Sequence, residues 1–316
     1  MRRGKPKVSI IILNWNGKEV LRKCLSSLLK LTDYPNYKVI VVDNASTDSS
    51  VEMIKAKFKN VDLLENKENL GFVKGNNIGI RYALRKYNPA YILLLNNDTE
   101  VVQKDWLKRL VDIAESDRRI GLVGCKLIFP DRRIQWAGRK RETNVFYLIF
   151  QTLSASLNPG VGMDEKESSF IGEVNTVSGA CMMIKSELIR KIGLLDESLS
   201  PFFQEDVEYS FRTWKSGYKV FYVGTSTVIH LQSYSFEKRK FVDEKLYLAL
   251  RNSTIVSKKY FGVMKTIFFG LPILILTVFL ERRNKTLGFS INNLKFRGNL
   301  ISKILILKRV IRCLFV

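Results

Sequence analysis

The stretch from Tyr91 to Glu100, YILLLNNDTE, decides the fold prediction because an apolar run passes directly into polar residues. The run at 91–95 predicts a strand buried on both faces, as in parallel sheets that helices cover. Asn96, Asn97 and Asp98 then fall where the chain leaves the sheet. Asp98 either binds a metal ion or caps the next helix, and a lone NND motif does not decide between the two.

Strand and helix patterns alternate around this stretch. Apolar runs predict further strands, and apolar residues at helical spacing lie between them. This order predicts an α/β fold with a mostly parallel, Rossmann-like sheet between layers of helices. The runs that predict strands are residues 8–14, 37–44, 61–66, 91–98 and 120–129, and residues 218–231 predict two short strands.

Three of the predicted strands end in polar residues. Asn14 and Asn16 follow the first strand, Asp43 follows the second, and residues 96–98 follow the fourth. Because ligands of open α/β sheets bind at the carboxyl ends of the strands, we expect these residues to share one cleft. Asp43 alone is equally consistent with a contact to a nucleobase or ribose and with an Asx turn.

The composition indicates anionic partners. The 316 residues include 52 lysines and arginines against 30 acids, a formal net charge of +22. Residues 236–316 carry 17 of these basic residues and only four acids, so we expect a separate C-terminal segment at an anionic surface. The four cysteines form no C-x-x-C pair, which predicts reduced thiols and neither a disulfide framework nor a zinc site.

The remaining motifs are ambiguous by themselves. Residues 68–80 contain three glycines at four-residue spacing, which is not a dinucleotide-binding fingerprint and is typical of close helix packing or of a ligand contact. Glu205 and Asp206 begin a predicted helix, where acids stabilise the helix dipole or one of them acts as a general base. Glu208 and Arg212 are spaced to pair, and His230 is the only histidine.

Taken in order, these segments resemble the inverting family 2 glycosyltransferases of GT-A fold, and within them the rhamnosyltransferase- and galactofuranosyltransferase-like enzymes. The resemblance covers roughly residues 8–236. It is carried by VSIIILNWNG, VVDNASTDSS, NLGFVKGNNIGI, LLLNNDTEV, VSGACMMIKSELIRKIGLLDE, FFQEDVEYSFRTWKSGYKV and VIHLQSYS.

The resemblance implies a role for each matching residue. Asp206 matches the catalytic base, and Asp98 with His230 matches the site of a divalent cation, Mn²⁺ or Mg²⁺. The residues implied to bind the nucleoside-diphosphate sugar donor are Asn14, Asn16, Asp43, Asn69, Gly71, Asn77 and Asn97. Two positions depart from the family pattern: Asn96 replaces the first acid of the D-x-D motif, and Lys74 stands where a small residue is common.

The resemblance also implies transfer of a sugar to a saccharide acceptor that is lipid-linked, in cell-surface glycan synthesis. We expect a catalytic domain at 1–236 and a helical, membrane-associating segment at 237–316, on the cytoplasmic face of the cell membrane. Residues 266–280 are uncharged but shorter than the roughly 20 residues of a membrane span, so an interfacial, a spanning and a packed segment all stay open. Residues 301–316 predict an amphipathic helix on an anionic leaflet.

Two other functions are compatible with the sequence. A non-catalytic sugar-nucleotide-binding protein is favoured by Asn96, which weakens the metal site. A basic nucleic-acid-binding protein is compatible with the charge, but the sequence has no aromatic and basic stacking motif of the RRM kind. We therefore expect no nucleic-acid partner.

Overall fold

The computed structural model describes residues 4–136, 168–231, 242–270, 272 and 300–315. The chain divides into two compact units. The first contains the described residues up to 201 and those at 205–231. The second contains residues 202–204 and the described residues from 242 onward. The predicted boundary between residues 236 and 237 lies outside the described residues.

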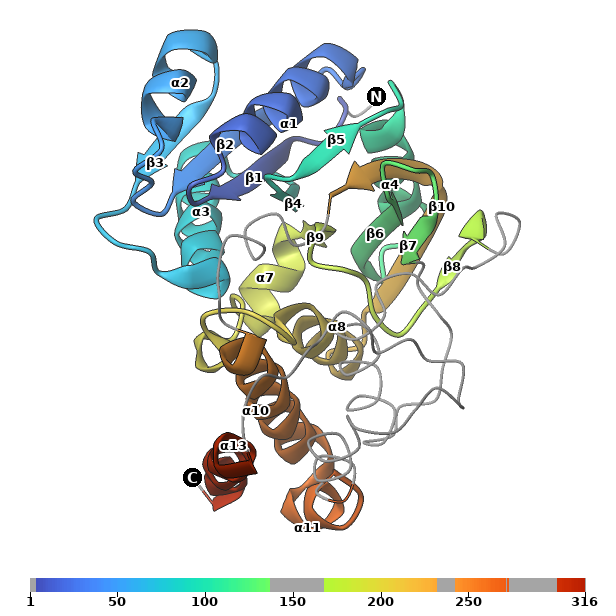
Figure 1. Ribbon diagram of the computed structural model, residues 1–316. Helices are drawn as coiled ribbons and strands as arrows, with labels where there is room; N and C mark the ends of the chain where they lie inside the picture. Colours follow the sequence, from blue (N-terminus) through green and yellow to red (C-terminus); the bar gives the residue numbers. More distant parts are fainter. Residues whose placement is uncertain (1–3, 137–167, 232–241, 271, 273–299, 316) are drawn as a thin grey trace. The chain divides into compact units, whose positions relative to one another are not determined.

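One sheet forms the centre of the first unit, with the strand order β3-β2-β1-β4-β9-β6-β10-β5 (Figure 1). Its first four strands are parallel, as the alternating pattern predicts. The β1–β2 register ends on Asn14 opposite Asp43, and the β1–β4 register ends on Leu13 opposite Asn96. The polar residues that follow these strands therefore emerge at the same edge of the sheet.

The remainder of the sheet is antiparallel in part, so the sheet as a whole is mixed. β9 runs antiparallel between β4 and β6, and β5 pairs antiparallel with the end of β10. The prediction of two short strands in residues 218–231 is wrong, because β10 is one strand, Lys219–His230. The pairing of β10 with β6 is irregular between Val223 and Thr227. The sequence of this irregular part resembles a break between two strands.

The strand bounds follow the apolar runs closely. The strands are β1 Val8–Asn14, β2 Tyr37–Asp43, β3 Asp62–Glu65, β4 Tyr91–Asn96, β5 Thr99–Val101, β6 Ile120–Ile128, β7 Ile134–Trp136, β8 Ile171–Glu173, β9 Cys181–Lys185 and β10 Lys219–His230. The helices of the first unit are α1 Lys18–Leu31, α2 Ser50–Lys57, α3 Gly71–Tyr87, α4 Trp106–Ser116, α7 Ser186–Ile192, the 3₁₀ turn η1 Glu197–Leu199 and α8 Glu205–Lys215.

Helices cover both faces of the sheet, and side chains that alternate along each strand separate two apolar clusters. Ile10 and Ile12 of β1 pack in the cluster that α1 and α4 cover. Ile11, which points to the opposite face, packs in the cluster that α3, α7 and α8 cover. The four cysteines are free, and burial raises the pKa of the Cys24 thiol to about 12.

The second unit is helical in the part that the structure describes. It contains α10 Val242–Phe261, α11 Val263–Lys265, the π-helix η2 Thr266–Gly270 and α13 Leu300–Phe315. The pattern at 301–316 therefore predicts its helix correctly. Within this unit, the Arg309 guanidinium of α13 lies 4.0 Å from the centre of the Tyr247 ring of α10. Within the described ranges, no helix is long and apolar enough to cross a membrane. Most of the uncharged stretch 266–280 lies outside those ranges.

The N-terminus of α3 is fixed by the loop that precedes α8. The carbonyl of Pro201 accepts hydrogen bonds from the N–H groups of Phe72, at 2.7 Å, and Val73, at 3.3 Å. Gly71 has a φ of +77°, and a Cβ at this position would lie 2.6 Å from the Cβ of Pro201. Both the backbone conformation and the close approach therefore require glycine.

We expect Gly71→Ala to destabilise the protein more than Gly217→Ala does. Gly217 has a similar φ of +86° but faces open space, so its change measures the backbone strain alone, about 1–2 kcal/mol. Gly71→Ala adds the clash with Pro201, and we expect a further loss of a few degrees in melting temperature. Equal melting temperatures for the two variants would show that the contact with Pro201 does not constrain the fold.

Candidate active site

The carboxyl edge of β1, β2 and β4 is held together by buried polar side chains. The Asn14 amide donates to Asp43 Oδ2 at 2.9 Å, and the Asn97 amide donates to Asn14 Oδ1 at 2.8 Å. Asp43 also accepts from the N–H and the hydroxyl of Ser46. The structure thus brings the three predicted polar clusters together. Asp43 does not cap the next helix, because α2 begins only at Ser50 and the Asp43 carboxylate accepts from the N–H three residues on.

Two residues at this edge were missed by the sequence analysis. Ser46 links the loops, since its hydroxyl also accepts a hydrogen bond from the N–H of Asn16 at 2.8 Å. A Cβ on Gly17 would lie 2.5 Å from the Asn97 amide nitrogen and 2.9 Å from Asn14 Oδ1. Gly17 therefore leaves the room that the Asn14–Asn97 pair needs. The only signal for Gly17 is its place directly after NWN.

Asn16 and Asn69 order the backbone of neighbouring loops. Asn16 Oδ1 accepts from the N–H of Thr47 at 2.7 Å, and Asn69 Oδ1 accepts from the N–H of Gly71 at 3.0 Å. Asn44, which directly follows β2, donates to Asn69 Oδ1 at 3.3 Å and to the carbonyl of Gly71 at 3.1 Å. The loop before α3 is therefore tied to the end of β2, beside the other predicted donor-binding residues.

Asn77 is placed differently from the other residues predicted to bind the donor. Its side chain is fully buried, and its amide donates to the carbonyl of Leu195 and to Glu197, both at 3.0 Å. Its Oδ1 accepts from the N–H of Leu195 at 3.1 Å. Both amide hydrogens of Asn77 are therefore used in fixing the loop before η1, and its hydrogen bonds do not reach the other candidate residues.

Asp98 and His230 lie together, as the resemblance implies. His230 Nε2 is 3.2 Å from Asp98 Oδ1, and both side chains are buried. Gln135 fixes the imidazole on its other side, because its amide nitrogen donates to the His230 carbonyl and its Oε1 lies 2.6 Å from His230 Nδ1. This orientation of the amide makes Nδ1 the donor, so the lone pair of a neutral ring at Nε2 faces Asp98.

These atoms fit a divalent cation. With the ring neutral, Nε2 and Oδ1 each offer an electron pair to a cation between them. Asn96 lies beside this pair, with its amide nitrogen 3.2 Å from His230 Nε2 and its buried Oδ1 without a hydrogen-bond partner among the described residues. Turning this amide over would direct the carbonyl oxygen toward His230. A carbonyl oxygen is a suitable ligand for Mg²⁺ or Mn²⁺, and waters and phosphates complete such shells. The described residues contain no group of three or more His, Cys, Asp or Glu side chains around a metal position.

Asp206 lies in the first turn of α8 and is held by backbone amides. Its Oδ2 accepts from the N–H of Gly179 at 2.9 Å, and its Oδ1 accepts from the N–H of Val207 at 2.8 Å. Burial raises the pKa of the Asp206 carboxyl, and the two amides oppose that rise. An ionised carboxylate with a raised pKa is a stronger base than an exposed one, which suits proton abstraction.

The segment Gly179-Ala180 joins Asp206 to the end of β4. While Gly179 donates to Asp206, the carbonyl of Ala180 accepts from the N–H of Asn96 at 3.0 Å. The candidate base and the Asn96–Asp98 segment are therefore attached to neighbouring residues of the same turn. No local sequence pattern indicates this connection.

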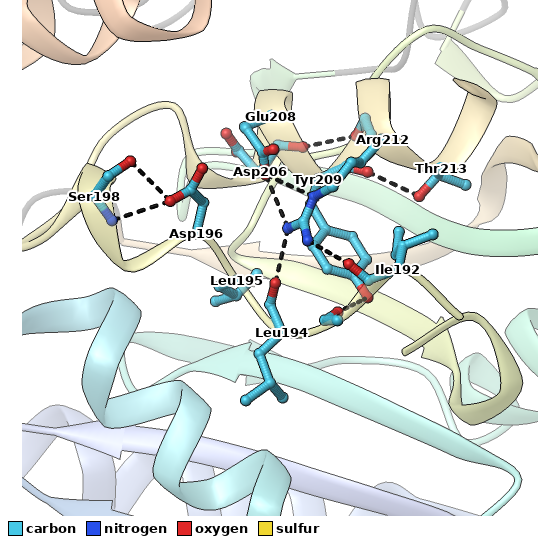
Figure 2. A network of polar contacts seen from close by, with 12 residues as sticks. Ile192, Leu194, Leu195, Asp196, Ser198, Asp206, Glu208, Tyr209, Arg212 and Thr213 are labelled. Carbon is cyan, nitrogen blue, oxygen red and sulfur yellow. Dashed lines mark hydrogen bonds and ion pairs between the residues drawn. The ribbon is translucent and has the colours of Figure 1, made fainter. Parts of the chain in front are cut away.

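The orientation of α8 is fixed by the polar network in Figure 2. Arg212 pairs with the fully buried Glu208 at 2.9 Å and donates to the carbonyls of Ile192 and Leu194, both at 2.7 Å. The prediction that Glu208 and Arg212 pair is therefore confirmed. Since the same helix carries Asp206, this network positions the candidate base.

Comparison with known proteins agrees with this geometry. The Glycosyl transferase family 2 profile matches residues 9–193, which is more than half of the chain. The chain belongs to glycosyl transferase family 2. This match covers the polar edge, Asp98 and the Gly179-Ala180 turn, whereas Asp206 and His230 lie beyond it.

Named relatives act in glycan synthesis. The chain is 30% identical over 240 residues to the O-antigen biosynthesis protein RfbC of Myxococcus xanthus, covering 74% of this chain but only 18% of that protein. It is 24% identical over 245 residues to an N-acetylglucosaminyl-diphospho-decaprenol L-rhamnosyltransferase of Mycobacterium tuberculosis, covering 72% of this chain and 76% of that one.

A solved structure shows that the fold is that of GT-A glycosyltransferases. GalNAc-T7 with UDP, GalNAc and Mn²⁺ superposes with a TM-score of 0.62 at 19% identity. The superposition covers 86% of this chain and 51% of that one. This likeness confirms the predicted fold class, a sheet with layers of helices on both faces.

We expect Asn96→Asp to tighten Mn²⁺ binding, because it adds a second carboxylate beside Asp98 and His230. The expected gain is about tenfold in affinity, measured by calorimetric titration with Mn²⁺ in the presence of UDP. Asn60→Asp, which adds the same charge at an exposed position, serves as the control. Equal affinities for both variants and the parent protein would place the metal elsewhere.

Proposed function

We propose that this glycosyltransferase transfers a sugar from a nucleoside-diphosphate sugar to a hydroxyl of a saccharide acceptor, with inversion at the anomeric carbon. The observation that carries the proposal is the Gly179-Ala180 turn, which attaches the base Asp206 beside the Asn96–Asp98 segment. A hexosyl and a rhamnosyl donor both fit this chemistry, and one relative is named as a rhamnosyltransferase.

The donor nucleotide is assigned to the polar edge of β1, β2 and β4. Asp43 fixes Asn14 and Ser46, and we assign it to the nucleoside end of the donor. Asn16, Asn69 and Gly71 then line the same donor through the loops that they order, and Asn97 does so beside Asn14. Asn77 contributes through the loop that it holds.

Asp98 and His230, with the carbonyl of Asn96, are the side chains that would hold a divalent cation, and Gln135 would keep the imidazole in the binding tautomer. Such a cation, Mn²⁺ or Mg²⁺, neutralises the charge of a diphosphate leaving group when it is bound. GalNAc-T7 is described with UDP and Mn²⁺, which supports the assignment.

Asp206 accepts the proton of the acceptor hydroxyl as that oxygen attacks the anomeric carbon. The Gly179 and Val207 amides hold both carboxylate oxygens in place, so the carboxylate needs no reorientation before the reaction. One base on the acceptor side and a single displacement invert the configuration, and no covalent sugar–enzyme intermediate is required.

Replacing Asp206 tests the proposed base. Asp206→Asn keeps the size of the side chain, exchanges one acceptor oxygen for a donor, and removes the proton acceptor. We expect nucleotide binding to persist, the melting temperature to fall by no more than about 4 °C, and transfer to fall at least 1000-fold. Transfer near the parent rate would refute the assignment of the base, and donor binding without any transfer by the parent protein would favour a non-catalytic binding protein.

The pH dependence of transfer provides a second check on the same residue. Because burial raises the pKa of Asp206, its carboxylate takes up a proton above the ordinary carboxyl range as the pH falls. Activity should therefore decline on the acid side from a pH higher than an exposed aspartate would give. An acid limb at or below the ordinary range would point to a different base.

We further propose that the acceptor is lipid-linked and that the enzyme acts on the cytoplasmic face of an anionic membrane, which it contacts through its second unit. Met264 and Phe268, four residues apart, are 63% and 65% exposed, and Lys258, Lys259 and Lys265 lie close to them in the chain. Exposed apolar residues beside lysines are typical of a surface that binds anionic lipid.

Flotation of the full chain with vesicles that contain phosphatidylglycerol tests this surface. We expect the double variant Met264→Ser/Phe268→Ser to lose most of its vesicle binding. Leu29→Ser/Ile171→Ser, which removes two exposed apolar side chains from the first unit, should bind like the parent protein. Equal binding by both double variants would show that the Met264–Phe268 surface is not the membrane contact.

A further inference from the structure

Lys126 is a buried cation inside an otherwise apolar strand. All nine residues of β6 are buried, and Lys126 is 9% exposed. Removing an ammonium group from water is costly unless the protein or a ligand compensates its charge. A lysine in this position therefore needs a physical reason.

The described protein gives Lys126 little compensation. Its ammonium group has one hydrogen-bond partner among the described residues, the hydroxyl of Ser169 at 3.1 Å. No described carboxylate lies within ion-pair distance of it. A neutral hydroxyl orients the ammonium group but does not balance its charge, so the described residues leave the charge of Lys126 without a counterion.

Lys126 lies on the face of the sheet that α8 covers. Leu122 belongs to the apolar cluster on that face, and a Cβ on Gly124 would lie 2.6 Å from Val177 of the same cluster. Side chains two residues apart share a face, so Lys126 points to this side as well. Tyr209 of α8, three residues after Asp206, packs in the same cluster.

Lys126 is also level with the turn that holds Asp206. The antiparallel pairing of β6 with β9 reaches Gly124 opposite Met182. Continuing that register by two residues brings Lys126 opposite Ala180, the neighbour of Gly179. The backbone of Lys126 in β6 is thus level with the turn that precedes β9, which contains Gly179, the amide donor to Asp206.

We propose that Lys126 binds an anionic group of the acceptor, a phosphate or a carboxylate, next to the hydroxyl that Asp206 deprotonates. This inference rests on the proposed function of Asp206. The acceptor is favoured over the donor because Lys126 lies on the face of the sheet that α8 covers and level with the turn that holds the base. Asp98 and His230, by contrast, are the groups assigned to the donor diphosphate.

The first experiment measures anion binding without turnover. Inorganic diphosphate is added to the full chain in chelator, so that no metal contributes, and melting temperatures are recorded. We expect diphosphate to stabilise the parent protein and Lys126→Arg, and to leave Lys126→Gln unchanged. Without diphosphate, Lys126→Gln should melt at or above the parent temperature, because it removes a buried charge. A lower melting temperature with an unchanged diphosphate effect would show a purely structural lysine.

The matched control is Lys185→Gln, which removes a lysine charge at the end of β9 that lies away from the Gly179-Ala180 turn. Lys185 lines a separate cavity of about 730 Å³ with Arg118, Arg119, Arg190 and Lys191 among its lining residues. Diphosphate stabilisation that disappears in Lys185→Gln and persists in Lys126→Gln would assign anion binding to that cavity and overturn the proposal.

The second experiment distinguishes an acceptor anion from the donor diphosphate. The affinity for UDP with Mn²⁺ is measured by calorimetry, and transfer is measured against a dilution series of a lipid extract from the source cells. We expect Lys126→Gln to keep the UDP affinity and to raise the half-saturating amount of extract about 10- to 100-fold, the effect of one charge-assisted hydrogen bond. Weakened UDP binding with unchanged extract dependence would assign the anion to the donor.

Discussion

The candidate site depends on two hydrogen bonds to one turn. Gly179 donates to the Asp206 carboxylate, and the carbonyl of Ala180 accepts from the backbone of Asn96. These bonds attach the first turn of α8 to the end of β4, although Asn96 and Asp206 are 110 positions apart in the sequence. The turn leads into β9, the strand that runs antiparallel between β4 and β6. The antiparallel direction of β9 is therefore what delivers the turn to the carboxyl edge.

The loop before α8 is held from two sides. Asn77 of α3 binds it at Leu195 and Glu197, and its hydrogen bond lowers the pKa of the Glu197 carboxyl. Arg212 of α8 binds the same loop at the carbonyls of Ile192 and Leu194 (Figure 2). Neither residue needs to contact a substrate to affect the site. Together they set the distance between α3, which begins at the donor loop, and α8, which begins at the candidate base.

The backbone just before Asp206 has an unusual conformation. Phe203 and Gln204 have φ values of +80° and +68°, which side-chain-bearing residues rarely adopt, at a cost of order 1–3 kcal/mol each. The amide of Asn252 in α10 donates to the carbonyls of Phe202 and Phe203, both at 2.9 Å, and so helps to hold this strained segment. Strain of this kind is common at functional sites, where surrounding contacts enforce it.

The sequence predicts the parallel half of the sheet well because buried strands and amphipathic helices leave periodic patterns. It also predicts which polar residues meet at the carboxyl edge, since parallel strands bring their ends together. The roles of Gly17, Ser46, Gln135 and the Gly179-Ala180 turn could not be predicted in this way. Their effects arise from contacts between distant segments, such as Gln135 with His230, and no local pattern records such contacts. For the same reason Asn77, grouped with the donor-binding residues by resemblance, turns out to hold a loop.

Release of nucleotide from a panel of sugar nucleotides tests the central claim most directly, using the full chain with a lipid extract as acceptor. We expect one donor to release its nucleotide in Mn²⁺ or Mg²⁺ and none to do so in chelator. Release that is unaffected by chelator would contradict the cation site at Asp98 and His230. Failure of every nucleotide in the panel to bind would contradict the assignment of the carboxyl edge as a donor site.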